Sequence, residues 1–406
     1  MGLAKQLILV VNGGSSSIKF AVFESGNYLR KILTGKLEGI GSAEGQFSIK
    51  AEDSDASTKT IAAKNYADAT NIVMDWLKQF GKDHKITAIG HRIVHGGNNY
   101  SEPQFIDKEV LKELRRLSSL DPDHLPEEIL LAETTGRLFP NIPQVACFDT
   151  VFHRDMPTIA QRLPIPRRYF DMGIKRYGFH GLSCQYLMNT LSELAGTEAA
   201  RNKVILAHLG SGASVTAVYG GKSVDTSMSL TPCSGLPMSS RSGDIDPGLV
   251  LQLKQLEGMK AKQFHDMVNH ESGLKGISGS SENINELLAQ EQKDTHAAEA
   301  VDYFCYQTRK WICALAGAMG GVDTLIFSGG IGENLAEIRA RICENLNFIG
   351  VAIDLEKNQT NNLIISSPKS QVTVRVIKTD EELVIANNVA TFLDQHKGLH
   401  HERSQR

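Results

Sequence analysis

No apolar run in the 406-residue chain approaches the roughly 18 residues of a membrane-spanning helix. Residues 7–11 are apolar, but they follow one lysine and precede Asn-Gly-Gly in place of a small-residue cleavage site, which favours a strand over a signal peptide. The formal net charge of −3 gives no electrostatic reason for a nucleic-acid or anionic-membrane partner. We therefore expect a chain that binds neither.

Cysteine is scarce as well. The six cysteines are scattered and form no Cys-x-x-Cys pair, which argues against a zinc site or a disulfide framework. Free thiols are typical of a reducing compartment, so we expect a cytoplasmic protein. At about 100–200 residues per domain, the length predicts two or three domains.

Short β-branched runs alternate with stretches of helical spacing, which is the pattern of an α/β protein. Strands are expected at residues 86–89, 145–148, 204–208, 325–327 and 372–377. Helices are expected at residues 108–117, 127–135, 248–256, 297–319 and 334–346. Residues 42–60 are polar and acid-rich, and they predict a surface excursion.

An internal repeat is the most informative feature. Residues 7–23 read LILVVNGGSSSIKFAVF and residues 204–219 read VILAHLGSGASVTAVY, each a strand, a Gly/Ser turn and a second strand. A repeat at about half the chain length predicts two domains of similar topology, although two hairpins can also resemble each other by chance. Small residues let backbone N–H groups converge on an anion, so two such turns facing each other would grip a polyphosphate, with Lys19 adding a charge. Neither turn is a Walker A loop.

Three further segments carry chemistry. Residues 323–334 read DTLIFSGGIGEN, a strand followed by a Gly-rich turn and a helix, which suits contact with phosphate or adenosine. Arg92 lies in GHRIVHGG and Arg241 in a long polar loop, and arginine suits phosphate and carboxylate ligands. Asp149 follows an apolar strand, where α/β sites gather. Taken singly, each residue is more often a surface ion pair or a loop cap.

Nine motifs occur together and in order: NGGSSSIKF, GHRIVHGG, FDTVFH, RYGFHGLS, AHLGSGAS, DTSMSLTP, RSGDIDPG, FSGGIGEN and TDEELVIA. Over residues 7 to about 386 the chain resembles the acetate kinase (acetokinase) family of the actin/Hsp70/sugar-kinase superfamily. The resemblance implies an α/β fold of two duplicated actin-like (ribonuclease H-like) domains with an active-site cleft between them. The expected domains are residues 1–150 with 387–406, and residues 151–386, the latter binding nucleotide.

The resemblance implies reversible, Mg²⁺-dependent phosphoryl transfer between ATP and acetate, giving acetyl phosphate and ADP, in a homodimer. Mn²⁺ is an alternative metal. We favour direct in-line transfer over a phospho-enzyme formed on Asp149 or Glu381, because arginines, a histidine and a metal suit it without an intermediate. Propionate or butyrate kinase is a close alternative. A non-catalytic actin-like nucleotide-binding protein and a sugar kinase are the alternatives from other classes.

The resemblance also implies roles for individual residues. Asn12 and Glu381 match the residues that support Mg²⁺, and Arg92 matches the carboxylate-binding arginine. Arg241 matches a transition-state arginine, and His180 a histidine that donates to the moving phosphoryl group. Asp149 matches the residue that orients the acid; we read it as positioning, since acetate is already ionised at pH 7. The residues that match the acid-binding pocket are Val94, His124, Phe179 and Pro232.

The remaining matches are on the nucleotide side. The turn at residues 210–212 matches the family's phosphate-binding segment, and the turn at residues 330–334 matches its adenosine-side segment. Asn283 and Asn285 stand where the family carries an aspartate and an arginine beside the base and ribose. The nucleotide-binding set is Lys19, His208, Leu209, Gly210, Ser211, Gly212, Asn283, Asn285, Gly330, Ile331, Gly332, Glu333 and Asn334.

Several positions depart from the family. Asn283 replaces the ribose-binding carboxylate and Asn285 the stacking guanidinium, so GTP, a promiscuous site or pyrophosphate remain alternatives to ATP. Asp123 stands where leucine is usual in the acid pocket, which favours a polar or longer acid unless its side chain turns to solvent. Inside the motifs, small residues differ from the usual ones at three positions, Ser211, Gly13 and Cys184. We expect these differences to tune the rate, and the sequence does not explain Cys184.

Overall fold

The computed structural model describes residues 6–14, 16–26 and 28–396. The chain divides into two compact units, one formed by Met1–Val151 with Asp380–Arg406 and the other by Phe152–Thr379. The second boundary falls at residue 380, where the sequence placed it at 387. No helix in the described part of the chain is long and apolar enough to cross a bilayer.

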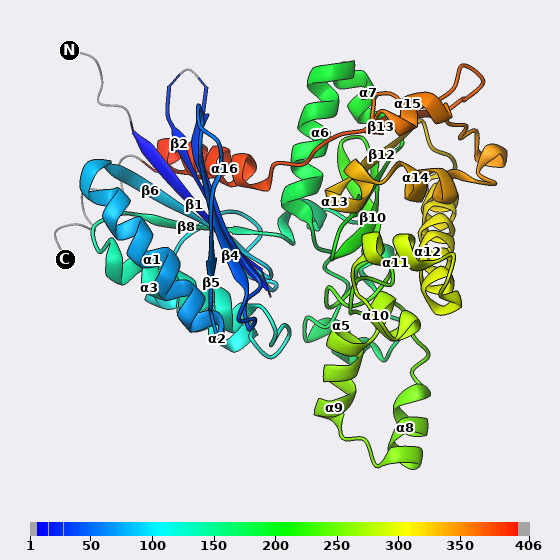
Figure 1. The fold of residues 1–406 in the computed structure, drawn as a ribbon, viewed down its shortest axis with the longest axis horizontal. Coiled ribbons are helices and arrows are strands. Elements are labelled where there is room, and N and C mark those ends of the chain that lie inside the picture. Colours follow the sequence, from blue (N-terminus) through cyan, green and yellow to red (C-terminus); the bar gives the residue numbers. More distant parts are fainter. Residues whose placement is uncertain (1–5, 15, 27, 397–406) are drawn as a thin grey trace. The chain divides into compact units, whose positions relative to one another are not determined.

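The first unit is built on one sheet whose order is β5-β4-β3-β2-β1-β6-β8-β7 (Figure 1). Strands β6 and β8 run parallel to β1, and β2 to β5 form an antiparallel meander. The strands are β1 (Leu7–Gly14), β2 (Ser17–Glu24), β3 (Arg30–Glu38), β4 (Gly45–Ala51), β5 (Ser57–Ile61), β6 (Ile86–Ile93), β7 (Gln104–Phe105) and β8 (Gln144–Phe148). The helices are α1 (Tyr66–Asp83), α2 (Lys108–Leu117), α3 (Leu125–Leu138) and α16 (Glu381–Gln395).

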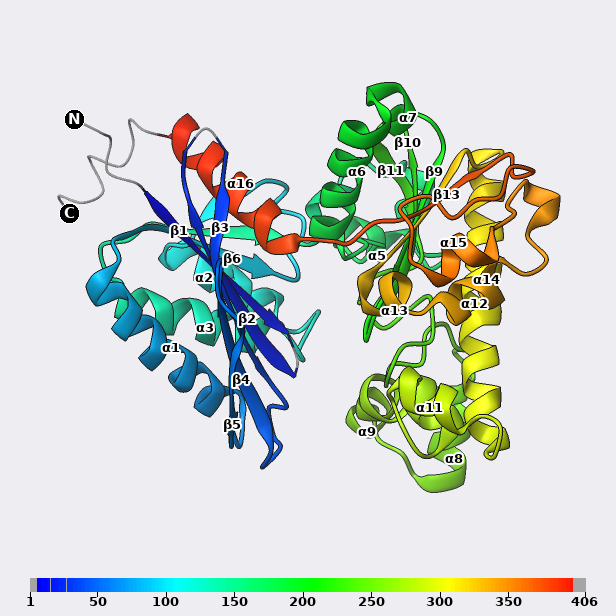
Figure 2. The same ribbon diagram turned by 45° about the horizontal axis from the view of Figure 1, so that its top comes forward.

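Alternation along β1 decides which helices cover which face of this sheet. Leu7, Leu9 and Val11 join the apolar core beneath α1 and α3. The opposite face receives α16, which comes from the far end of the sequence (Figures 1 and 2). A Cβ at Gly90 would lie 2.5 Å from Ile385 of α16, so the close approach of this helix requires glycine. The predicted excursion at residues 42–60 is an ordered edge hairpin, β4–β5, whose side chains are mostly exposed.

The second unit has a smaller sheet with the order β11-β10-β9-β12-β13. It lies between α6 and α12 (Figures 1 and 2). The strands are β9 (Val204–Leu209), β10 (Ala213–Tyr219), β11 (Lys222–Thr226), β12 (Thr324–Ser328) and β13 (Thr373–Val376). The helices of eight residues or more are α6 (Gly181–Ala195), α8 (Leu249–Glu257), α12 (Thr295–Met319) and α14 (Ala336–Cys343). The shorter α-helices are α4 (Thr158–Gln161), α5 (Arg167–Asp171), α7 (Thr197–Arg201), α9 (Ala261–Asp266), α10 (Gly273–Ser278), α11 (Ile284–Gln290), α13 (Gly329–Asn334) and α15 (Leu355–Gln359).

The two sheets repeat one topology. In each, a three-stranded meander is followed by two strands parallel to its first strand, as β3-β2-β1-β6-β8 and as β11-β10-β9-β12-β13. The prediction of an α/β fold with duplicated domains is therefore confirmed. The expected Gly-rich turn at residues 329–334 is itself helical, forming α13, and α14 follows it.

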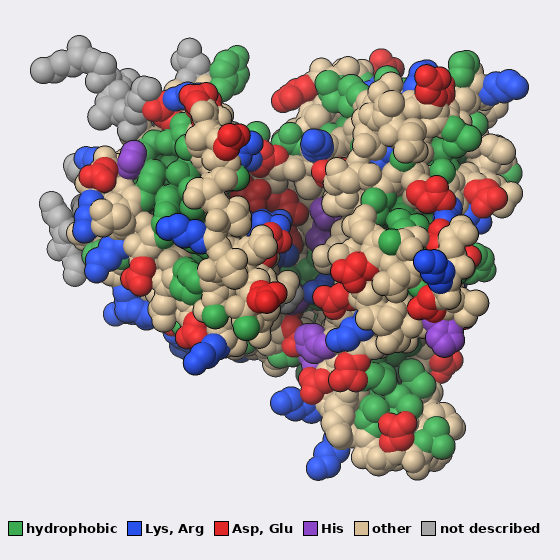
Figure 3. All heavy atoms as spheres, viewed as in Figure 1, with side chains coloured by type: hydrophobic (Ala, Val, Ile, Leu, Met, Phe, Trp, Pro, Cys, Tyr) green, Lys and Arg blue, Asp and Glu red, His purple; other side chains and the backbone are tan. Residues whose placement is uncertain are grey.

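One surface of the second unit is notably apolar. Hydrophobic side chains gather over α8 (Figure 3), where Val250, Leu251 and Leu256 are exposed. Helix α8 has no buried residue, and only its Leu249 and Leu253 are half-buried among its apolar side chains.

Candidate active site

Three polar residues meet at one edge of the first sheet. Asn12 lies near the carboxyl end of β1, Arg92 near the carboxyl end of β6, and Asp149 directly after β8. Val11 pairs with His91 and Arg92 with Cys147, so the three residues occupy equivalent levels on neighbouring parallel strands. The carboxyl edge of parallel strands is where α/β proteins place their sites.

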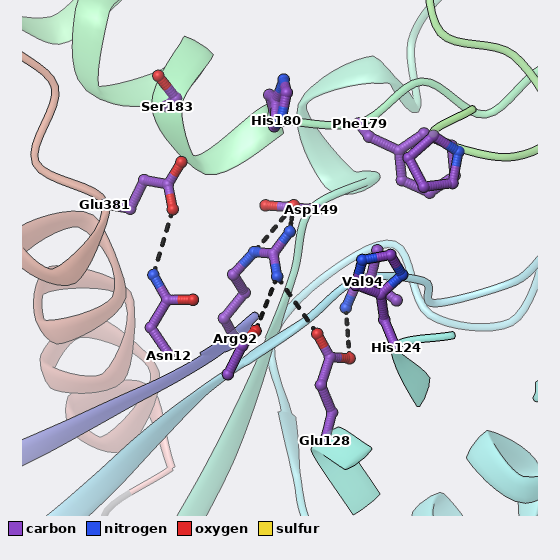
Figure 4. Close-up of polar contacts among 12 residues, drawn as sticks. Asn12, Arg92, Val94, His124, Glu128, Asp149, Phe179, His180, Ser183 and Glu381 are labelled. Atoms are coloured by element: carbon purple, nitrogen blue, oxygen red, sulfur yellow. Dashed lines mark hydrogen bonds and ion pairs between the residues drawn. The ribbon is translucent and has the colours of Figure 1, made fainter. Parts of the chain in front are cut away.

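Arg92 is held by a dense set of acceptors (Figure 4). Its Nε and Nη2 donate to Asp149 Oδ2 at 3.0 and 2.6 Å. Its Nη1 donates to the Gly13 carbonyl at 3.1 Å and to Glu128 Oε1 at 3.3 Å. Burial alone would lower the pKa of Arg92, but the carboxylates of Asp149, Glu128 and Glu381 outweigh it and raise the pKa. The guanidinium is thus permanently charged and fixed in orientation.

Asp149 carries an oxygen that faces no donor. The residue is 0% exposed, and among the described residues Oδ1 has no hydrogen-bond partner. A buried carboxylate oxygen without a partner is costly, so its persistence indicates a site that a ligand, water or ion completes.

Oxygen donors suited to a hard cation lie beside this edge. Asn12 Nδ2 donates to Glu381 Oε2 at 3.3 Å and to Glu382 Oε1 at 3.2 Å, at the first turn of α16 (Figure 4). In the described parts of the chain, no three His, Cys, Asp or Glu side chains are arranged to hold a metal. The donor set fits Mg²⁺, which usually takes one or two carboxylates and completes its shell with water and substrate phosphate. Lys19 pairs with Asn12 across β1 and β2 and lines a cavity with Glu382.

This unit holds two predicted acid-pocket residues, His124 just before α3 and Val94 directly after β6. His124 is buried, and its Nδ1 lies 2.8 Å from Asp121 Oδ1. Val94 is buried and its N–H donates to Glu128. Asp123 is half-buried; burial and the charges of Asp123 and Asp121 raise the pKa of Glu127 to about 7.

In the second unit, two Gly-rich turns lie against each other. Ser328 of β12 pairs with His208 of β9, so both turns leave the same edge of the sheet. Gly329 has φ 76°, and a Cβ there would lie 2.5 Å from the Leu209 carbonyl. A Cβ at Gly210 would lie 3.8 Å from the Gly330 nitrogen. Only glycine permits this close packing at position 329.

His180 and Arg241 converge on the first of these turns. A Cβ at Gly212 would lie 3.2 Å from His180 Nε2 and 3.7 Å from Arg241 Nη1. His180 adopts φ 58°, a left-handed conformation that is costly for a residue with a side chain and is typical of functional sites. Its Nδ1 lies 3.0 Å from Ser214 Oγ, which orients the ring. An imidazole, a guanidinium and a bare backbone thus surround one small volume.

The hydroxyl groups of Ser183 and Thr379 orient His208. His208 Nδ1 and Thr379 Oγ1 each lie 2.8 Å from Ser183 Oγ, and the rings of His208 and His180 are 4.3 Å apart. The Thr379 N–H and the Gly329 N–H donate to Glu333 Oε1 at 3.0 and 2.9 Å. Glu333, predicted to bind nucleotide, therefore serves first to tie the turn to the end of the second unit.

The other predicted nucleotide-side residues have local roles. Asn283 caps α11 by accepting from the Asn285 N–H at 3.0 Å, and both side chains are exposed. Asn334 Nδ2 donates to the Gly330 carbonyl. Ile331 and Gly332 are buried within α13, and the Ser211 carbonyl accepts from the Ser239 N–H. These contacts leave nucleotide binding by this set a prediction.

Two residues of the second unit belong to the predicted acid pocket. Phe179 is buried, and its carbonyl lies 2.9 Å from His153 Nε2. The Pro232 carbonyl accepts from Arg241 Nη1 at 3.4 Å. Cys184 is also buried: it packs in the core between α6 and β9 with its Sγ 3.8 Å from Thr216 Oγ1, which explains it as a packing residue.

Five residues at the site were not predicted from the sequence: Glu128, Ser183, Ser214, Thr379 and Tyr66, whose buried hydroxyl lies against Gly13. Ser183, Ser214 and Thr379 lie inside motifs already recognised, so their proximity to the histidines was a usable signal. Glu128 and Tyr66 had none, because a glutamate and a tyrosine in the first turns of amphipathic helices are typical of ordinary surfaces.

Two sheets of one topology, with charged and imidazole side chains at the ends of their parallel strands, define a kinase of the actin-like superfamily. The chain belongs to the acetokinase family, whose model matches residues 7–387.

Individual relatives cover almost the whole chain. It is 40% identical over 399 residues to an acetate kinase of Rhodopseudomonas palustris, covering 96% of this chain and 98% of the relative. Among solved structures, a propionate kinase from Francisella tularensis superposes with a TM-score of 0.87 at 36% identity, covering 95% and 99% of the two chains. An acetate kinase from Porphyromonas gingivalis gives 0.83 at 33% identity, covering 96% and 100%.

Proposed function

We propose that this kinase transfers the γ-phosphoryl group of ATP, reversibly and with Mg²⁺, to a short-chain monocarboxylic acid, giving an acyl phosphate and ADP. The orphaned Oδ1 of Asp149 beside the Arg92 guanidinium is the observation that carries the proposal. The fixed Arg92 guanidinium can pair with an anionic oxygen of the acid. The unpaired, buried Asp149 Oδ1 can accept a hydrogen bond from a group that is bound next to that oxygen.

The first unit holds the acid. Arg92 pairs with its carboxylate, and Asp149 keeps the guanidinium in place and orients the acid. Because acetate is ionised at pH 7, no proton has to be removed before the carboxylate oxygen attacks. Within this unit, the buried Val94 and His124 line the place of the acid's acyl group.

The second unit holds the phosphates and neutralises the moving group. Backbone N–H groups of residues 210–212 bind phosphate oxygens, His180 Nε2 donates a hydrogen bond, and Arg241 offsets the developing charge. In-line phosphoryl transfer needs little beyond alignment and charge stabilisation, and these groups supply both.

Asn12 and Glu381 would hold Mg²⁺, which would supply neutralisation of phosphate charge when bound; Mn²⁺ would suit the same oxygen donors. The remaining nucleotide contacts are assigned to Lys19, His208 and the turn at residues 330–334. The protein acts in the cytoplasm as a homodimer, and the apolar surface of α8 is one face on which to seek the dimer contact.

A hydroxamate assay for acyl phosphate tests the proposal. ATP, GTP and pyrophosphate are each paired with acetate, propionate, butyrate and glycolate in the presence of Mg²⁺. We expect product with ATP and with acetate or propionate; preference for glycolate would implicate Asp123 in acid choice. Absence of product from every pair would refute the proposal.

A further inference from the structure

Glu128 is a second buried carboxylate on Arg92, and the function proposed above gives it no role. It lies in α3 with 2% of its surface exposed. Its Oε1 is 3.3 Å from Arg92 Nη1, and its Oε2 accepts from the Val94 N–H at 2.8 Å. Figure 4 shows the carboxyl group reaching both Arg92 and the backbone of Val94.

The donors of Arg92 are nearly all engaged. A guanidinium has five N–H donors. Two point at Asp149 Oδ2, and the two on Nη1 point at the Gly13 carbonyl and at Glu128. An acid that binds Arg92 through two hydrogen bonds must therefore displace an acceptor. The Gly13 carbonyl is fixed in its strand, and Asp149 accepts two hydrogen bonds from Arg92. Glu128 is therefore the acceptor that a bound acid displaces most easily.

Charge balance leads to the same residue. One guanidinium would face three buried anions if Asp149, Glu128 and a bound acid were all ionised, and such an arrangement is strongly unfavourable. Burial raises the pKa of Glu128 to about 8, although Arg92 and the Val94 N–H favour its ionised form. The other groups facing it oppose ionisation: Asp121 before α3 and Asp149 after β8 add negative charge. From α1, the Tyr66 hydroxyl faces it: burial, and after it the charge of Glu128, raise the pKa of Tyr66.

We propose that Glu128 sets the affinity for the acid: the anionic acid binds only when Glu128 is neutral, and it takes the Arg92 Nη1 donor that Glu128 releases. This inference rests on the proposed function, since it assumes that the acid binds Arg92. When Glu128 starts ionised, binding takes up one proton, which remains on its carboxyl group. An acyl phosphate presents a neutral carbonyl at the same place, so its binding lacks this requirement.

The test compares Glu128→Gln, which imitates the neutral form, with wild type between pH 6 and 10. In wild type, KM for acetate or propionate should be level below pH 8 and rise about tenfold per unit well above it. In Glu128→Gln it should stay level within about twofold, so the variant binds acid roughly tenfold better at pH 9. KM for acetyl phosphate should lack this rise in both proteins.

Glu127→Gln is the matched control, because Glu127 is the neighbouring residue in α3 and is not among the acceptors to which Arg92 donates; it should keep the wild-type profile. Calorimetry of acetate binding at pH 9 in two buffers of different ionisation enthalpy gives a second readout. Wild type should take up close to one proton and Glu128→Gln none. A level wild-type profile, or a variant that weakens acid binding equally at every pH, overturns the inference. Failure of the proposed function looks different: wild type would then make no acyl phosphate from any acid.

Discussion

The carboxyl edges of the two sheets share a topology and differ in chemistry. The first edge uses charged and amide side chains fixed by hydrogen bonds: the buried Asn12 and Asp149 and the half-buried Arg92. The second edge uses the glycine backbone at residues 210 and 212 together with Arg241. It also carries His180 and His208, whose rings are oriented by serine hydroxyl groups. Under the proposed function, one duplicated scaffold would supply both a small-anion site and a polyphosphate site, because the side chains at strand ends decide the chemistry.

Removing an arginine from each edge should separate the two roles most strongly. We expect Arg241→Ala to lower kcat by about 10³-fold or more, as loss of a charge-stabilising arginine does in phosphoryl transfer, with a small change in KM for the acid. Arg92→Ala should raise KM for the acid as well as lower kcat. Steady-state kinetics in both directions measure this, with the exposed Arg167→Ala as control. Equal KM effects in both variants would contradict the division of roles.

Two buried histidines have pKa values that burial lowers, His91 in the first unit and His153 in the second, so acid should weaken both units. Burial lowers the pKa of His91 and of His153 to about 4, from an ordinary value of about 6.5. The unfolded chain therefore binds a proton between pH 6.5 and 4 that the folded chain does not, and each histidine costs up to about 3 kcal/mol as pH falls through that window.

His153→Gln removes this titration from the second unit and His91→Gln from the first. Each variant should gain in free energy of unfolding relative to wild type as pH falls from 7 to 4, as urea denaturation followed by circular dichroism can show. The difference from wild type is the quantity to compare, because the raised pKa values of Glu127 and Glu128 act in the opposite direction. A difference that stays constant over the window would show that the histidine is not neutral in the fold.

A methyl group at Gly212 should damage activity but not folding. Its Cβ would lie 3.2 Å from His180 Nε2 and 3.7 Å from Arg241 Nη1, in the volume assigned to the phosphoryl group. We expect Gly212→Ala to lower kcat about 10²-fold, since misplacing reacting groups by about an ångström costs that much. Thermal unfolding should shift little, because no backbone atom is in the way. Full activity would place the phosphoryl group elsewhere.

A methyl group at Gly13 should do the reverse. Its Cβ would clash with the buried Tyr66 hydroxyl, so Gly13→Ala should lower the free energy of unfolding by about 1–3 kcal/mol. Tyr66→Phe removes the obstructing oxygen and should restore most of the loss in the double variant. Gly210→Ala, at the aligned position of the second unit, meets nothing closer than 3.4 Å and serves as control. Lack of rescue by Tyr66→Phe would refute the steric explanation.

The sequence predicted the strand-end residues of both units because each follows an apolar run inside a recognisable motif. Arg92 and Asp149 were expected separately, and the register of β6 with β8 brings them together. Glu128 could not be foreseen, since its burial depends on how α3 crosses the sheet, a long-range packing outcome that no local pattern encodes. Cys184 was unexplained for a similar reason: its neighbour Thr216 comes from β10. Nucleotide binding by Asn283 and Asn285 stays a prediction.

Helix α16 has a consequence for how the protein is made. The second unit is one continuous stretch, Phe152–Thr379, whereas the first needs residues from both sides of it. A ribosome releases the first sheet long before it has translated the helix that covers the Gly90 face. Domains generally fold as units during synthesis. The second unit can therefore finish folding before α16, which the first unit needs, has been translated.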